Sequence, residues 1–211
     1  MTSSDVWTAE QAQRYDEEGG MFSDEVLAPT VEGLAALADG GAALEMAIGT
    51  GRVAVPLRAK GVPVAGIELS PPMVAQLRTK VSVEEIPVAI GDMATTRVEG
   101  AFSLVYLVYN TIGNLCTQEE QVECFRNAAR HLVPGGRFVV EVGVPSLRRL
   151  PPGQAAVPFD VSDEHVGFDT YDVVTQEAVS HHLTRQPDGS HRRGTPFTGA
   201  SGSHVSVWRV G

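Results

Sequence analysis

The sequence predicts an α/β fold, a mostly parallel sheet with helices on both faces, followed by a small C-terminal antiparallel β extension. Three observations predict it. Short apolar segments alternate with helical patterns over residues 42–143. These segments are apolar along most of their length, as in parallel strands that are covered on both faces. After Val144 no convincing helix follows, and residues 164–185 read as a β-hairpin or two strands.

Two helices are expected before the sheet begins. Residues 8–17 read as a short helix with Trp7 and Tyr15 as its aromatic anchors. Residues 24–38 carry apolar side chains near helical spacing, and Gly40-Gly41 is expected to end that helix.

The core is expected to alternate strands and helices. The expected strands are residues 43–48, 62–67, 86–90, 101–108 and 137–142, and the expected helices are residues 52–60, 71–80 and 118–131. Ser70 followed by Pro71 is typical of a helix start. Thr117 and Glu120 have the spacing of a capping box, and Pro134-Gly135-Gly136 is expected to end the last helix.

The C-terminal part changes character. Residues 151–160 are rich in proline and glycine, Asp188-Gly189 is a turn signal, and residues 194–203 look like a loop. Residues 204–210 alternate between polar and apolar side chains, so we expect a final edge strand there.

Charge and composition narrow the class of partner. The net charge of the 211 residues is −10, and residues 1–46 hold ten acids against a single base, Arg14. Such a surface repels nucleic acid and anionic membranes, so a small molecule is the expected partner. No apolar run is long enough to span a bilayer, the first residues do not resemble a secretory signal, and two cysteines suit a reducing compartment. We therefore expect a cytoplasmic protein.

Three features follow the first three expected strands. A glycine turn, Ala47-Ile48-Gly49-Thr50-Gly51, follows the first strand, Glu68 ends the second, and Gly91-Asp92-Met93 follows the third. Each also has a purely structural interpretation: a tight turn, a carboxylate near the Ser70 helix start, and an Asx turn. Together they lie at the carboxyl ends of consecutive parallel strands, where open α/β sheets bind ligands.

The residues around these features resemble the class I S-adenosylmethionine (SAM)-dependent methyltransferases of small-molecule type, which have a Rossmann-like fold. The resembling segments are LEMAIGTGR, GIELSPPMV, AIGDM, LVYLVYNTIGNL and HLVPGGRFVVEV, within residues 7–145. Two features depart from the family pattern. Ala47 stands where the family has its first glycine, and part of the usual C-terminal elements, a helix and an antiparallel strand pair, is lacking after the fifth strand.

The resemblance implies a domain plan. It assigns residues 1–40 to N-terminal helices that form a cofactor or substrate lid, residues 41–145 to the SAM-binding core, and residues 146–211 to a β-rich extension and final edge strand.

The resemblance also implies cofactor contacts. Glu68 would bind the ribose, Asp92 the adenine amino group, and Leu69 and Met93 would flank the adenine. Leu107 and Asn110 would touch the methionine end, and Ala47, Gly49 and Gly51 would pack along the methionine and ribose portion. Glu45 would orient the loop or, through water, the SAM ammonium, and Tyr15 would close over the cofactor. The implied cofactor-binding residues are Tyr15, Glu45, Ala47, Gly49, Thr50, Gly51, Glu68, Leu69, Asp92, Met93, Leu107 and Asn110.

The expected reaction is methyl transfer from SAM to the nitrogen or oxygen of a small-molecule acceptor, by in-line displacement. The protein mainly has to align donor and acceptor, because the displacement itself needs little covalent help. An amine acceptor only has to arrive neutral, whereas a hydroxyl needs a general base. Candidate bases are His181, His182 and Tyr109, and at most one of the two adjacent strand histidines can face a cleft. No metal site is expected, since the histidines lack ligand spacing with the cysteines.

Other functions stay open. An NAD-dependent oxidoreductase also fits the segment Gly49-Thr-Gly51-Arg-Val-Ala54 together with Glu68. Against it, the only lysines are Lys60 and Lys80, so the tyrosine–lysine pair of the short-chain dehydrogenases cannot be built downstream. A non-catalytic or truncated SAM-binding protein is a second alternative. A homodimer remains an option.

Overall fold

The computed structural model describes residues 7–17, 23–143, 150–172, 174, 177–185, 191–193 and 203–209. The chain divides into two units, the first formed by Met1–Val142 with Val205–Gly211 and the second by Gly143–His204. Each unit is built around its own sheet.

The first unit holds a sheet with the strand order β10-β5-β4-β1-β2-β3. Its strands are β1 (Ala43–Met46), β2 (Val64–Glu68), β3 (Val88–Ile90), β4 (Phe102–Leu107), β5 (Leu132–Gly143) and β10 (Ser203–Arg209). The pairs β1–β2, β2–β3, β1–β4 and β4–β5 are all parallel, which confirms the predicted fold class. The strand order reverses between β1 and β4, and a crevice forms at such a switch point in open α/β sheets.

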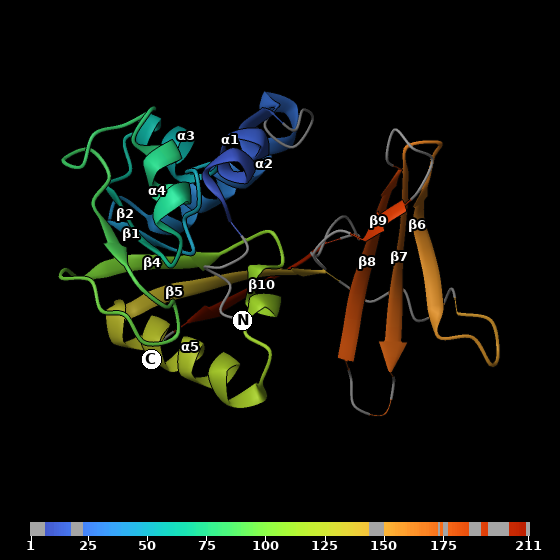
Figure 1. The fold of residues 1–211 in the computed structure, drawn as a ribbon. Helices are drawn as coiled ribbons and strands as arrows, with labels where there is room; N and C mark the ends of the chain where they lie inside the picture. The colour runs from blue at the N-terminus through green and yellow to red at the C-terminus, as the bar shows by residue number, and fades with distance from the viewer. Residues whose placement is uncertain are drawn as a thin grey trace. The chain divides into compact units, whose positions relative to one another are not determined.

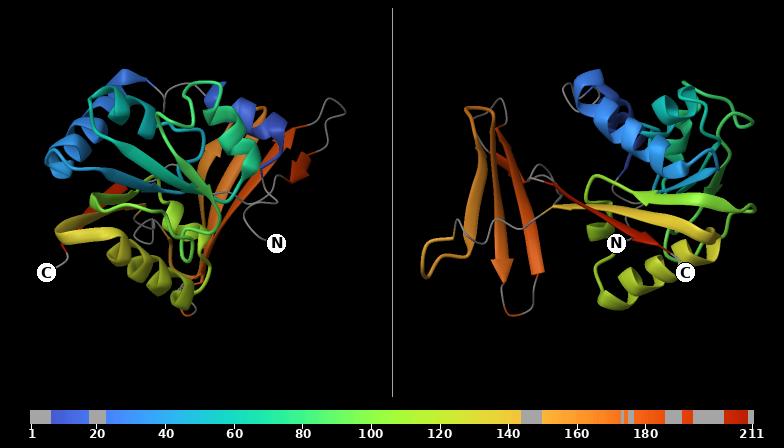
Figure 2. Two further views of the ribbon diagram at one scale, coloured as in Figure 1. Left: turned by 90° about the vertical axis from the view of Figure 1, so that its left-hand side faces the viewer. Right: turned by 180° about the vertical axis from the view of Figure 1, so that it is seen from behind.

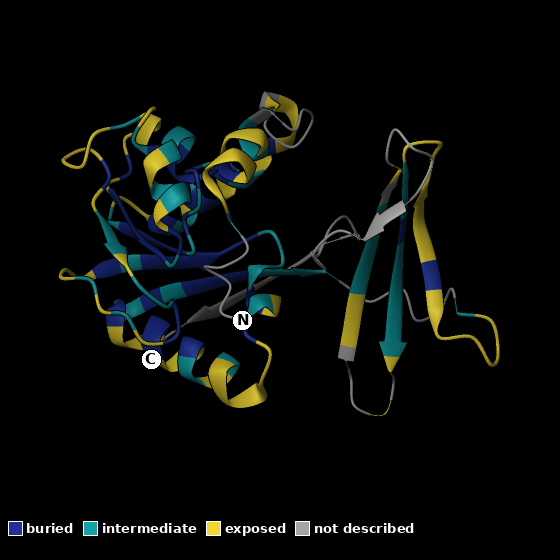
Figure 3. Cartoon of the chain, in the orientation of Figure 1, coloured by how far each residue is buried: buried dark blue, intermediate teal, exposed yellow. Residues whose placement is uncertain are grey.

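Helices cover both faces of this sheet (Figures 1 and 2). The helices are α1 (Ala9–Glu17), α2 (Asp24–Ala38), α3 (Ala54–Ala59), α4 (Pro71–Leu77) and α5 (Gln118–His131), with a short 3₁₀ helix, η3 (Thr111–Asn114). The first four lie on one face and α5 lies on the other. The sheet is therefore the middle of three layers, and its central strands β1 and β2 are buried along their whole length (Figure 3).

Side chains alternate between two apolar cores, one on each face of the sheet. Ala43 and Leu104 belong to the core under α2 and α3, whereas Leu44 and Val105 belong to the core that contains residues of α5. This alternation follows from the two-residue period of a strand. It explains why the predicted strands are apolar at nearly every position rather than at every second one.

The two predicted helix caps are confirmed, whereas the helix expected at 52–60 begins at Ala54. Ser70 Oγ accepts a hydrogen bond from the Met73 backbone N–H at 3.4 Å, with Pro71 at the first helical position. In α5, Thr117 and Glu120 satisfy each other's backbone N–H groups at 3.2 and 2.9 Å. These local hydrogen bonds need only the residues of one turn, so the sequence predicts them well.

The Pro134-Gly135-Gly136 segment differs from expectation. Helix α5 ends at His131, as the expected range has it, but the chain enters β5 at once and the Pro-Gly-Gly lies inside that strand. The pairing register shifts between Phe102 and Leu104 on the neighbouring strand. The shift absorbs the extra residues of β5, as a bulge does.

The second unit is an antiparallel sheet with the order β6-β7-β8-β9. Its strands are β6 (Ala156–Val161), β7 (His165–Asp172), β8 (Glu177–Arg185) and β9 (His191–Arg193). The predicted strand pair at 164–185 corresponds to β7 and β8. Strand β6 was not predicted, because residues 151–160 are rich in proline and glycine. The strand lies at an edge of the sheet, where a proline such as Pro158 is tolerated.

The end of the chain returns to the first unit. The predicted edge strand at 204–210 corresponds to β10, which lies at the edge of the parallel sheet next to β5. The predicted Asp188-Gly189 turn and the predicted loop at 194–203, apart from its last residue, lie outside the described residues.

Candidate functional site

The tips of β1, β2 and β3 lie side by side at one edge of the first unit. The Ile48 N–H donates to the Ile67 carbonyl at 3.0 Å, and the Gly91 N–H donates to the Glu68 carbonyl at 2.9 Å. These backbone hydrogen bonds therefore join the three segments that the sequence singled out.

The glycine turn after β1 has an unusual backbone. Ala47, Gly49 and Gly51 have positive φ angles of 56°, 58° and 82°. Left-handed backbone costs an L-residue such as alanine about 1–2 kcal/mol, whereas glycine adopts it freely. Ala47, the departure from the family pattern, therefore carries strain that a glycine would not, and such strain is typical of functional sites.

The two glycines of the turn have different surroundings. A Cβ on Gly49 would meet Met73 Cε at 3.7 Å, an ordinary contact. A Cβ on Gly51 would overlap Leu77 Cδ1 and would lie 3.0 Å from Val55 Cγ2. Gly51 therefore lets α3 and α4 pack against the turn.

Glu68 ties the glycine turn to the β2–α4 corner. Its Oε2 accepts from the Gly49 N–H at 2.8 Å and its Oε1 accepts from the Ser70 N–H at 2.9 Å. The side chain is buried; burial raises its pKa, and the N–H groups of Ser70 and Gly49 oppose that shift. Because each carboxylate oxygen can accept more than one hydrogen bond, the contact with a ribose stays a prediction alongside this structural contact.

Asp92 forms the Asx turn that was the alternative interpretation. Its Oδ1 accepts from the Ala94 N–H at 2.7 Å, and its carbonyl accepts from Thr95 and Thr96 at 3.1 and 2.8 Å. Asp92 is half-buried and Met93 is buried. The predicted contacts of Asp92, Leu69 and Met93 with adenine stay predictions.

Glu45 is buried in the sheet, where Tyr106 is its register partner on β4. The Tyr106 hydroxyl donates to Glu45 Oε2 at 2.9 Å. Burial raises the pKa of Glu45 to about 8, against the opposing effects of the Tyr106 hydrogen bond and the Arg52 charge. The carboxyl is therefore largely protonated at neutral pH. Its predicted role, which is to orient the loop or, through water, the SAM ammonium, stays a prediction.

Replacing Glu45 by glutamine is expected to change how stability depends on pH. The pKa of Glu45 is raised from 4.5 to about 8, so the folded state binds more protons than the unfolded state between these values. The resulting stabilisation is complete below pH 4.5 and is lost progressively as the pH rises to about 8. Glu45→Gln stays neutral and does not lose this stabilisation. Urea unfolding should therefore show the free energy of unfolding of the variant rising relative to that of the wild type as the pH rises through this window.

Glu99, an exposed residue, supplies the control. Glu99→Gln should leave the pH profile of the wild type unchanged. A Glu45→Gln profile that runs parallel to the wild type from about pH 5 to 8 would show that the Glu45 pKa is not raised.

Arg52 brings together two predicted aromatic residues. Its guanidinium lies 4.5 Å from the centroid of the Tyr109 ring and forms a side-chain hydrogen bond with Tyr15 of α1. Burial raises the pKa of Tyr15 to about 12, so its hydroxyl stays protonated. The sequence predicted Tyr15 and Tyr109 but missed Arg52, although Arg52 directly follows the glycine turn.

The segment after β4 is also strained. Tyr109 and Asn110 have φ angles of 62° and 58°, and the Tyr109 N–H donates to Glu141 Oε2 of β5 at 3.0 Å. Leu107 is completely buried in the core on the α5 face. The predicted contacts of Leu107 and Asn110 with the methionine end of SAM stay predictions.

The two candidate histidines belong to the second unit and differ in their partners. His182 Nδ1 lies 3.0 Å from His165 Nε2, and His165 Nδ1 lies 2.6 Å from Asp160 Oδ2. His181 stacks on Phe168, with ring centroids 4.7 Å apart. The different partners agree with side chains on opposite faces of β8. The catalytic roles of His181, His182 and Tyr109 stay predictions.

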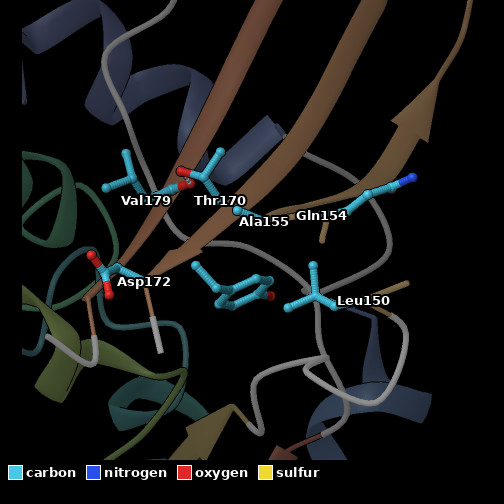
Figure 4. A pocket seen from close by; sticks show the side chains of 7 residues that line it. Leu150, Gln154, Ala155, Thr170, Asp172 and Val179 are labelled. Atoms are coloured by element: carbon cyan, nitrogen blue, oxygen red, sulfur yellow. Dashed lines mark hydrogen bonds between the residues drawn. The ribbon is translucent and has the colours of Figure 1, made fainter. Parts of the chain in front are cut away.

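The second unit contains a hollow of about 480 Å³ that the sequence did not predict (Figure 4). Its lining comes from the segment before β6 and from β7 and β8, and consists of Leu150, Gln154, Ala155, Thr170, Tyr171, Asp172 and Val179. These residues come from three segments of the chain and carry no motif, so they come together only when the strands pair.

Two classes of feature are absent from the described part of the chain. Among these residues, no group of three or more histidine, cysteine, aspartate or glutamate side chains could hold a metal ion. Within the same residues, no helix combines the length and apolar character needed to cross a bilayer.

Comparison with known proteins places this chain in a family. A family model described as a methyltransferase domain matches residues 43–136. The structure of the CcbJ methyltransferase from Streptomyces caelestis is 31% identical, with a TM-score of 0.70, and the match covers 95% of this chain and 79% of that one. The chain belongs to the class I SAM-dependent methyltransferase family.

Curated members of this methyltransferase family are similar over the core. One is a dTDP-4-amino-2,3,4,6-tetradeoxy-D-glucose N,N-dimethyltransferase of Saccharopolyspora spinosa, 36% identical over 100 residues, which are 46% of this chain and 39% of the relative. Another, from Streptomyces venezuelae, is a dTDP-3-amino-3,4,6-trideoxy-alpha-D-glucopyranose N,N-dimethyltransferase, 34% identical over 46% of this chain and 40% of the relative. The matched segments thus span less than half of the length of these relatives.

Proposed function

We propose that this chain transfers a methyl group from SAM to an amino group of a small-molecule acceptor in the cytoplasm. The observation that carries the proposal is the joining of the glycine turn, Glu68 and the Asp92 turn at adjacent strand tips, next to the β1–β4 switch point. A single extended ligand can reach all three, as an adenosyl group requires.

The residues at the tips suit SAM. Glu68 already fixes the glycine turn, so its carboxylate is preorganised to accept the ribose hydroxyls. The carboxylate of Asp92 is held by the Ala94 N–H beside buried Met93, which suits an adenine amino group and ring. SAM supplies an activated methyl group on a sulfonium. The chain holds donor and acceptor in line and excludes water, which can supply several kcal/mol.

An amine is the acceptor that the relatives favour. Two curated relatives above 30% identity are named as sugar N,N-dimethyltransferases. A neutral amine needs no general base, so this reaction does not require the histidines of the second unit. An O-methylation would require one, and His181, His182 and Tyr109 stay the candidates for that role.

Ligand binding and turnover test the proposal together. SAM and its demethylated product S-adenosylhomocysteine (SAH) are expected to raise the melting temperature, and NAD is not. With a dTDP-amino sugar, mass spectrometry should detect the addition of a methyl group, and the corresponding hydroxy sugar should stay unmodified. Stabilisation by NAD alone would refute the proposal. Binding of SAH without turnover of any amine would support the non-catalytic alternative.

The predicted homodimer is a separate question, which sedimentation velocity would test.

A further inference from the structure

Asp16, in the last turn of α1, accepts hydrogen bonds from three distant residues. Its Oδ1 accepts from the Thr50 hydroxyl at 2.6 Å. Its Oδ2 accepts from Gln76 Nε2 at 3.0 Å and pairs with Lys80 Nζ at 2.6 Å. The side chains of Asp16 and Lys80 are only 15% and 29% exposed. Both oxygens of this carboxylate are therefore engaged in a partly buried network.

The same network holds Thr50 from two sides. Thr50 lies between Gly49 and Gly51 and is 1% exposed. Its hydroxyl donates to Asp16, and its backbone carbonyl accepts from Lys80 Nζ at 2.9 Å. Lys80 in turn pairs with Asp16, which closes a ring of three residues around the middle of the glycine turn.

A second contact from the same turn of α1 reaches the same loop. Tyr15 forms a hydrogen bond with Arg52, two residues after Thr50. By contrast, Glu10 of α1 pairs with Arg14 of the same helix, and both side chains are exposed. Tyr15 and Asp16 thus supply polar contacts that dock α1, and both of them reach the glycine turn or the residue that follows it.

We infer that Asp16 is a positioning residue that couples α1 to the cofactor loop. It fixes Thr50, and with it the left-handed turn at Gly49 and Gly51, and it keeps Tyr15 beside that turn. The inference rests on the proposed function, since it assumes that the turn binds SAM. Cofactor binding and the docking of α1 then stabilise each other, because both require the same loop conformation.

Variants of both partners test the coupling. Asp16→Ala removes all three acceptor contacts, and Thr50→Val removes only the hydroxyl at a nearly constant shape. For each variant, SAH affinity by titration calorimetry is expected to fall by about tenfold or more, which is about 1.4 kcal/mol. In Asp16→Ala the KM for SAM should rise while kcat at saturating SAM changes little. In both variants the amides of α1 should exchange faster with deuterium.

Matched variants separate this role from general stability. Glu10→Gln, on the same helix but exposed, should leave SAH affinity and α1 exchange at wild-type values, and Thr50→Ser should restore the affinity lost in Thr50→Val. If Asp16→Ala does not fold, Thr50→Val and Thr50→Ser carry the test alone.

Two outcomes distinguish the inference from the proposed function. No SAH binding by the wild type would refute the proposed function. If the wild type binds SAH, and Asp16→Ala and Thr50→Val both bind it within about twofold of the wild-type affinity, the inference is overturned and the function stands. If Asp16→Ala does not fold, the same result for Thr50→Val alone overturns the inference.

Discussion

Glu68→Ala is expected to remove most of the affinity for SAH and to weaken the fold as well. The carboxylate accepts from the Gly49 and Ser70 N–H groups, and truncation leaves both without their acceptor. An unsatisfied buried donor costs about 1–3 kcal/mol. Separately, loss of the proposed ribose hydrogen bonds should weaken the binding of SAH by ~1–3 kcal/mol. Calorimetry with SAH measures the second effect, and urea unfolding without ligand measures the first.

Glu85 offers a matched control for this substitution. Its Oε2 also accepts a backbone N–H, from Ser82 at 2.9 Å, but the side chain is exposed. Glu85→Ala should therefore leave SAH affinity unchanged and cost little stability, because water replaces the lost acceptor. Wild-type affinity in Glu68→Ala would contradict the ribose role of Glu68, and wild-type stability would contradict its structural role.

Gly51→Ala is expected to lower the free energy of unfolding by about 2–5 kcal/mol, the sum of two costs. The positive φ of 82° costs an alanine about 1–2 kcal/mol. The new Cβ would overlap Leu77 Cδ1, and overpacking of a well-packed core costs about 1–3 kcal/mol. Urea unfolding measures the sum.

Gly61→Ala isolates the packing cost. Gly61 has a similar φ of 91°, but a Cβ there would meet no atom within 4 Å. Its substitution should therefore cost only the backbone strain of about 1–2 kcal/mol. Equal losses in the two variants would show that Leu77 moves aside without cost and that close packing does not require a glycine at position 51.

Local signals made the fold of the core predictable. The capping residues Ser70, Thr117 and Glu120 act within one helical turn, so their hydrogen bonds follow from sequence spacing. The apolar strands predicted a sheet covered on both faces, and the two cores on opposite faces confirm it. Strand β6 was not predicted because residues 151–160 are rich in proline and glycine. A proline such as Pro158 is tolerated at an edge, and edge position depends on the finished sheet.

The candidate site was predictable in part. The order of Gly49, Glu68 and Asp92 along the chain indicated a ligand site at three strand tips, since parallel strands align their carboxyl ends. Arg52 and the network of Asp16 were missed, because a charged residue beside a turn or on a short acidic helix usually lies at the surface. Their contacts with Tyr109 and Thr50 join residues 57 and 34 positions apart.

The sequence by itself determined the parallel α/β core, the helix starts and the positions of the glycine turn and its acidic neighbours, because periodicity, caps and turns act over a few residues. Only the tertiary structure decided that Asp16 and Lys80 hold Thr50, that Glu45 lies against Tyr106, and that Gly51 packs under Leu77. These contacts depend on strand order and helix packing, which bring distant residues together and leave no periodic trace in the chain.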